Sequence, residues 1–182
     1  MKGFRYYPAK FVMRSKDPGS LRIIDLWSFR SSKSHKRYIV EVEHFSSHFI
    51  GIKFYWKGVE ASEDRYSLLT NDFEPRTIVM SCIQVMMYYY DNDSLTSFGF
   101  VGAHDLIATD SDAFPNKRFR FYRRMMLSLF SSDKFIQIND PATCIYMLVN
   151  KIMLEKGIFD FSSIEDELGR MYEGEYHLIL AD

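Results

Sequence analysis

The sequence predicts an α+β fold in which a mostly antiparallel mixed sheet packs with two principal helices. Segments 36–45 and 48–56 alternate apolar and polar side chains around a short polar turn, which is typical of a β-hairpin. Segment 75–90 is apolar around most of a helical circumference, and segment 117–130 is amphipathic at helical spacing. Because hairpins and helices are segregated along the chain, the pattern favours α+β over a doubly wound parallel sheet.

The first part of the chain is predicted to form strands. Residues 21–29 follow the turn-forming run Asp17-Pro18-Gly19-Ser20 and are interpreted as a first strand or an amphipathic lead-in. The hairpin strand 36–45 has two distinct faces, one with Tyr38, Val40 and Val42 and the other with Ile39, Glu41 and Glu43. After a polar loop, residues 65–70 are predicted to form a further short strand.

The strongest predicted helix begins at Pro75 and ends at Tyr90. The preceding residues 71–74 offer a capping side chain and an early acid, and Pro75 suits the first turn of a helix. The helix has one narrow polar stripe, formed by Thr77, Ser81, Gln84 and Tyr88. A helix with so little polar surface is expected to pack on several sides.

The rest of the chain continues the mixed pattern. Residues 97–102 indicate a buried strand, and the helix 117–130 follows a polar loop. Two closing strands, 135–139 and 144–150, are divided by Asp140-Pro141. Ser162-Ser163-Ile164-Glu165 then opens a final short helix in the manner of a capping box.

Composition points to one globular domain. The chain has 182 residues, of which 47% are hydrophobic and 26% charged, and it contains no internal repeat. We therefore predict a single domain, 1–182, with a lead-in at 1–34, a core at 36–150 and a helical extension at 151–182. Its two cysteines, Cys82 and Cys144, lie in apolar runs typical of buried free thiols.

Charge and hydropathy narrow the setting of the protein. No stretch approaches the roughly 20 apolar residues of a membrane span, and the basic start lacks the apolar core of a secretory signal. A cytoplasmic protein with no membrane partner is therefore expected. The net charge of −1 creates no general attraction to nucleic acid, so a nucleic-acid partner is disfavoured. His44 and His48 are near neighbours, but no third ligand stands at a recognised spacing, so no metal site is predicted.

The order of elements over residues 36–150 resembles the GNAT acyltransferase superfamily. That family has three antiparallel strands, a long helix, a strand, another helix and two closing strands. In the family, a glycine-rich turn before the long helix holds the pyrophosphate of acetyl-CoA through backbone N–H groups. The matching stretch here, 70–77, has no glycine, carries two acids and includes a proline that lacks an N–H. Arg76 and Thr77 are the residues of this stretch that the resemblance assigns to the cofactor.

The resemblance also implies roles for other side chains. The family has an asparagine near the start of the second helix and a tyrosine on it that protonates the leaving thiolate, and Asn116 and Tyr122 are similar in type and spacing. Tyr122 equally fits an amphipathic core position on the inner face of the helix. The general base is open among Glu41, Glu43, His44 and His48 of the hairpin, with Glu41 and Glu43 as the acidic candidates.

A basic helix face offers a second kind of site. Lys117, Arg120 and Arg124 recur at helical spacing, and such a face is either simply solvated or binds phosphates or the carboxylates of a partner. The acidic run after residue 165 could meet this face in another copy, so homo-oligomers are also considered.

These observations lead to one functional expectation and two alternatives. We expect a cytoplasmic GNAT-like domain without an intact acetyl-CoA motif that needs no cofactor and acts as a protein-binding or regulatory module, for example in a bacterial defence or toxin system. The first alternative is an active acyltransferase that uses acetyl-CoA with Tyr122 as general acid. The second is a weak nucleic-acid binder that uses the 117–124 basic face.

Overall fold

The computed structural model describes residues 4–16, 23–45, 48–66, 72–101, 117–140, 145–158, 161–162, 165–166 and 179–180. The chain forms two compact units, Met1–Ser94 and Leu95–Asp182, and each is described by itself. Strand pairs in both units are antiparallel, and helices accompany them, so the predicted α+β class with a mostly antiparallel sheet is confirmed. The organisation into a lead-in, a core and an extension stays a prediction.

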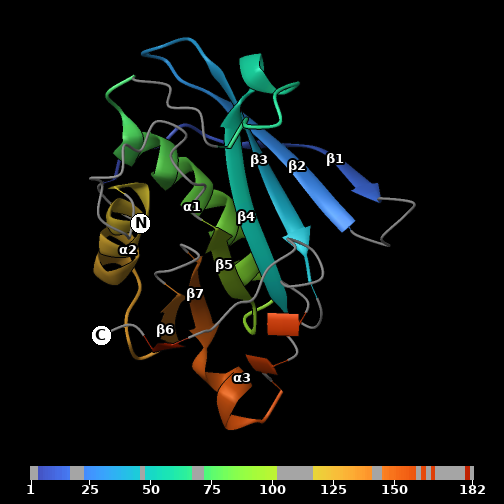
Figure 1. Cartoon of the computed structure of the whole chain (residues 1–182), viewed down its shortest axis with the longest axis vertical. Helices are drawn as coiled ribbons and strands as arrows, with labels where there is room; N and C mark the ends of the chain where they lie inside the picture. The colour runs from blue at the N-terminus through green and yellow to red at the C-terminus, as the bar shows by residue number, and fades with distance from the viewer. Residues whose placement is uncertain are drawn as a thin grey trace. The chain divides into compact units, whose positions relative to one another are not determined.

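Four antiparallel strands form the sheet of the first unit. They are β1 (Lys10–Lys16), β2 (Ile23–Arg30), β3 (Arg37–His44) and β4 (Phe49–Trp56), and they lie side by side in chain order (Figure 1). Trp27 pairs with Val40, which pairs with Phe54, so these three side chains share one face of the sheet. The alternation predicted for the hairpin is therefore confirmed in its register.

Two strand predictions in this unit need correction. β1 was not predicted, because its side chains are almost all exposed and show no apolar alternation. Residues 65 and 66, predicted as the start of a strand, form a turn after the short 3-10 helix Lys57–Val59. The side chain of Tyr66 turns back to Glu41 on the sheet, and this contact favours the turn over an extended segment. Residues 67–70 lie outside the described part of the chain.

The helix α1 (Pro75–Asn92) packs across one face of this sheet. The middle of its polar stripe is bonded by the N-terminal segment, because the backbone N–H of Tyr7 donates to Ser81 Oγ (2.8 Å) and that of Ala9 to Gln84 Oε1 (2.9 Å). Tyr88, at the end of the stripe, stays exposed. Cys82 is a buried free thiol, as predicted, and burial raises its pKa. Cys144 lies outside the described residues.

The second unit contains β5 (Ser97–Val101), α2 (Lys117–Leu129), β6 (Phe135–Asp140), β7 (Ile145–Asn150), α3 (Lys151–Glu155) and β8 (Ile179–Leu180). Its strands follow the order β5-β7-β6-β8. β7 is the central strand, and all six of its side chains are buried. α3 lies at the start of the predicted helical extension, although no separate helix was predicted there, and it begins where the Asn150 side chain accepts a hydrogen bond from the N–H of Ile152 (3.0 Å). The predicted helix from Ser162 falls largely outside the described residues.

Among the described helices, none combines the length and the apolar character that crossing a membrane requires.

Candidate functional site

The turn that precedes α1 is built around two carboxylates. Glu74 is buried, and it accepts hydrogen bonds from Tyr7 Oη (2.6 Å), Ser31 Oγ (2.5 Å) and Ser34 Oγ (3.2 Å). Asp72 accepts from Lys36 Nζ (2.8 Å) and from Tyr38. The side chain of the N-cap residue, Glu74, makes no capping hydrogen bond to α1, because it binds hydroxyl groups instead. Asn71, another residue of the predicted capping segment, lies outside the described residues.

Between these carboxylates stands Phe73, which is the most exposed large apolar side chain of the described residues at 88% exposure. Its backbone has a φ of 53°, in the left-handed region that bulky side chains avoid. Lys33 Nζ donates to the carbonyl oxygens of Asp72 (2.9 Å) and Phe73 (3.4 Å) and so holds this backbone in place. The turn thus presents an aromatic ring to solvent on a backbone that is fixed from both sides.

Replacing Phe73 with asparagine is expected to stabilise the protein by about 1 kcal/mol, because asparagine tolerates the left-handed conformation and Phe73 buries almost nothing. Thermal denaturation should show a rise in Tm of about 2–4 °C for a chain of this length. Phe73→Ala is the matched control, since alanine also removes the ring but keeps the backbone strain. Equal stability of the two variants would contradict this account of the turn.

The two residues assigned to the cofactor lie at the start of α1. Arg76 is exposed, and its guanidinium carbon lies 5.2 Å from the ring centroid of Phe4. Thr77 is half-buried, and its carbonyl oxygen accepts from Ser81 Oγ (2.9 Å). Pro75 has no N–H to offer. With no glycine in this stretch and no N–H at Pro75, the start of α1 offers fewer backbone donors than a phosphate-binding turn, so the residues present do not fit the phosphate group of CoA.

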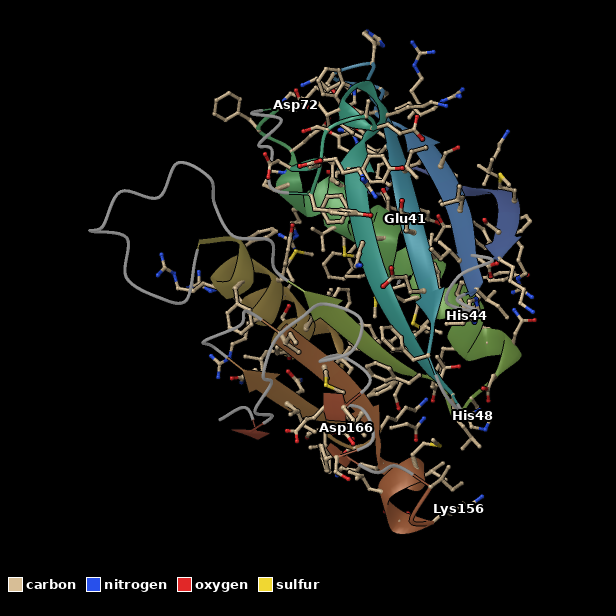
Figure 2. The ribbon with its side chains drawn as sticks, turned by 45° about the vertical axis from the view of Figure 1, so that its right-hand side comes forward. Glu41, His44, His48, Asp72, Lys156 and Asp166 are labelled. Atoms are coloured by element: carbon tan, nitrogen blue, oxygen red, sulfur yellow. The ribbon has the colours of Figure 1, made fainter. Side chains whose placement is uncertain are left out.

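The two acidic candidates for a general base lie on the opposite face of the sheet. Glu41 and Glu43 are both buried on β3, where Tyr66 Oη donates to Glu41 (2.5 Å) and Lys53 Nζ to Glu43 (3.0 Å). Burial raises the pKa of Tyr66, and its hydrogen bond to Glu41 raises it further. Figure 2 shows Glu41 near the middle of the sheet.

The guanidinium of Arg65 covers this face of the sheet. It lies 4.6 Å from the ring centroid of Tyr66 and 5.4 Å from that of Tyr55. Burial raises the pKa of Tyr55, and the neighbouring Glu41 and Glu60 carboxylates add to the increase. Both acids of β3 are thus bonded to neighbouring side chains, Glu41 by the Tyr66 hydroxyl and Glu43 in an ion pair with Lys53, as buried polar groups usually are.

A third polar cluster, centred on Asp25, was not found by sequence reasoning. Asp25 is 1% exposed, and it accepts two hydrogen bonds from Arg14 (2.6 and 2.7 Å), one from Tyr89 Oη (2.6 Å) and one from His44 Nε2 (2.9 Å). Burial alone would raise the pKa of Asp25, but the bonds from Arg14, Tyr89 and His44 outweigh it and lower the pKa to about 2. The available signal was the alternation of Asp25 with Trp27 and Phe29, which places an acid on the helix-facing side of β2.

The histidine pair of the hairpin is divided between two acids. His44 binds Asp25, whereas His48 Nδ1 lies 2.5 Å from Asp93 Oδ2. Both histidines lie at the end of the strands opposite to Asp72 (Figure 2). In the part of the chain that the structure describes, no cluster of three or more histidine, cysteine, aspartate or glutamate side chains is arranged to hold a metal ion.

The remaining candidates belong to the second unit. Tyr122 is half-buried on α2, with its ring 6.0 Å from that of Phe121. Arg120 and Arg124 are exposed, as predicted for the basic face. The backbone of Lys117 starts the helix, and Asn116 lies outside the described residues. Of the predicted catalytic and cofactor residues, Tyr122 belongs to the second unit, and Glu41, Glu43, Arg76 and Thr77 belong to the first.

Comparison with known proteins identifies no relative of this chain. The chain matches no protein-family model, no curated protein and no solved structure. The function is therefore argued from the side chains themselves.

Proposed function

We propose that this chain is a protein-binding module of GNAT-like element order that does not use acetyl-CoA. The observation that carries the proposal is Phe73, an aromatic side chain held in solvent by a strained turn at the start of α1. Exposed aromatic side chains on rigid backbones are typical anchors at the centres of protein interfaces. Strain in a backbone that its neighbours hold in place is itself a mark of a functional position.

The order of elements in each unit supports the GNAT-like part of the proposal. In the first unit a meander of antiparallel strands leads into the long helix α1. In the second unit β5, α2, β6 and β7 follow in the order that the resemblance implies. One difference is that residues 57–74 separate β4 from α1, where the resemblance implies a short phosphate-binding turn.

The hydrogen-bond donors at the start of α1 support the second part of the proposal, that the chain does not use acetyl-CoA. A phosphate-binding helix start offers backbone N–H groups to an anion. Here Pro75 removes one donor, and Asp72 and Glu74 place two carboxylates in the turn. Both carboxylates are already bonded, Asp72 to Lys36 and Glu74 to three hydroxyl groups, and neither offers a donor to an anion. The turn therefore suits a protein surface better than a nucleotide cofactor.

Titration calorimetry with CoA and with acetyl-CoA tests this proposal. We expect no binding heat for the wild-type protein at near-millimolar cofactor, and no difference for Arg76→Ala or for Tyr122→Phe. The physical reason is the lack of backbone donors at the start of α1, where the preceding turn has no glycine and Pro75 has no N–H. Micromolar binding that Arg76→Ala weakens would overturn the proposal and favour the acyltransferase alternative.

A further inference from the structure

A second exposed aromatic surface lies at the other end of α1. Tyr88 is 51% exposed and Phe11 is 52% exposed, and both rings make edge contacts with Trp27, at 4.9 and 5.5 Å between ring centroids. We call Phe11, Trp27 and Tyr88 the shelf, and Phe73 with Lys33 and Arg76 the knob. Trp27 is itself buried at 7% exposure, so the half-exposed rings of Phe11 and Tyr88 that pack on it offer the apolar contact area to a ring from outside.

The exposed charges without an ion pair among the described residues differ in sign between the knob and the shelf, since Asp72 at the knob is paired with Lys36 and Arg14 near the shelf is paired with Asp25. Lys33 and Arg76 are exposed beside Phe73, and neither forms an ion pair with a carboxylate among the described residues. The shelf has Asp91 one helical turn beyond Tyr88, on the same side of α1 and exposed. The knob thus combines an exposed ring with two cations, and the shelf combines exposed rings with an acid, so the two surfaces are complementary in charge.

The exposed charges at the two ends of α1 are the reverse of those that the helix dipole favours. The start of a helix carries partial positive charge and favours acids, and its end favours bases. In α1 the solvent-facing group of the first turn is Arg76, and the last turn contains Asp91 and no base. Within one chain these two exposed charges are unfavourably placed, although the buried Glu74 at the N-cap is an acid of the kind that a helix start favours. Their arrangement becomes favourable where the start of one α1 meets the end of another.

One copy cannot bring its own knob onto its own shelf. α1 has 18 residues and is about 27 Å long, and the two surfaces lie at its opposite ends. In Figure 2, Asp72 lies at the knob end of the sheet, and His44 and His48 lie at the other end. The contact must therefore form between two molecules.

We infer that the protein associates with itself head to tail, with the Phe73 knob of one copy seated on the Phe11–Trp27–Tyr88 shelf of the next. This inference rests on the proposed protein-binding function and names its partner as a second copy of the chain. Such a contact joins different surfaces on the two molecules, so it leads to rings or open chains and not to a closed two-fold dimer.

Pairing of the exposed edge of β1 with itself is the competing arrangement. Centred on Met13, an antiparallel β1–β1 pair would set Lys10 against Lys16, which places like charges opposite each other. The strand also has an irregularity between Phe11 and Met13, which disrupts a regular ladder. The shelf is therefore the better surface for a second copy.

Sedimentation velocity of the full chain, from micromolar to near-millimolar concentration, tests the inference. We expect the wild type to associate with increasing concentration, and less so at high salt because the knob and shelf charges are screened. Phe73→Asn and Tyr88→Lys should each weaken association about tenfold or more. Leu127→Asn removes another exposed apolar side chain, on α2, and should associate like the wild type.

Mixing the two variants gives the sharpest result. Phe73→Asn keeps an intact shelf and Tyr88→Lys keeps an intact knob, so an equimolar mixture should form a one-to-one dimer that neither variant forms alone. The mixture also shows that both variants are folded. A wild-type chain that stays monomeric throughout would overturn the inference, and so would an associating wild type whose variants form no dimer on mixing. Either result is independent of the CoA titration, which tests the proposed function.

Discussion

Replacement of Asp25 with alanine is expected to lower the free energy of unfolding by about 3 kcal/mol. The carboxylate joins Arg14 on β1, His44 on β3 and Tyr89 on α1, so its loss removes three sets of charge-assisted hydrogen bonds at once. Arg14 is 59% exposed and regains water, which keeps the cost below that of a fully buried pair. The hydroxyl of Tyr89, by contrast, loses its acceptor in a half-buried position.

Urea denaturation of Asp25→Ala, Asp25→Asn and Asp64→Ala measures this effect. Asparagine keeps the shape of the side chain but not its charge, so Asp25→Asn should lie between the wild type and Asp25→Ala. Asp64 is exposed, and its replacement should change stability by no more than about 0.5 kcal/mol. If Asp25→Ala unfolds at the same urea concentration as Asp64→Ala, the network does not stabilise the sheet.

The same carboxylate predicts how stability depends on pH. The pKa of Asp25 is about 2 in the folded protein, whereas the ordinary value of an aspartate in an unfolded chain is 3.8. The folded state therefore binds the proton less readily than the unfolded state. The stabilisation, about 2 kcal/mol, is therefore complete above pH 4 and is lost as pH falls from about 4 to about 2. In Asp25→Asn this part of the acid dependence should disappear.

Replacement of Tyr38 with alanine is expected to cost about 4 kcal/mol. Tyr38 is 1% exposed on β3, and its ring stacks on Phe29 with 5.2 Å between centroids. Its hydroxyl donates to Asp72 (2.7 Å), so the same side chain fills the core and anchors the turn that carries Phe73. The variant should lose the ring volume and the anchor together.

Tyr38→Phe separates these two contributions. It keeps the ring and removes only the hydroxyl, so thermal or urea denaturation should show a loss of about 1 kcal/mol. Asp72 retains its bond from Lys36 in this variant. A Tyr38→Phe protein as unstable as Tyr38→Ala would show that the bond to Asp72, and not the packing of the ring, dominates at this position.

Sequence reasoning located the elements whose side chains alternate or recur at helical spacing. The β3–β4 hairpin, α1, β5, α2, β6 and β7 all lie where these patterns predict them. It missed β1, whose exposed side chains carry no pattern, and it predicted a strand at residues 65 and 66, which form a turn. The turn depends on the bond between Tyr66 and Glu41, residues that are 25 positions apart in the chain.

The candidate site was harder to predict. The sequence showed that the segment before α1 is acidic and lacks glycine, which argued against a phosphate cradle, and the donor set in the structure supports that argument. It could not show that Phe73 is exposed, because an isolated phenylalanine in a sequence is most often buried. Only the bonds of Asp72, Glu74 and Lys33 to distant residues turn its ring outward.

By itself, the sequence determined which segments form strands and helices and which of their faces are apolar, since both follow from local periodicity. The tertiary structure decided what the polar side chains of those faces bind. Asp25, Glu74 and Asp72 meet partners on other elements, up to 67 residues away, and no local pattern encodes such a meeting. A buried acid must find donors wherever the fold brings them, so its role is settled only when the chain is folded.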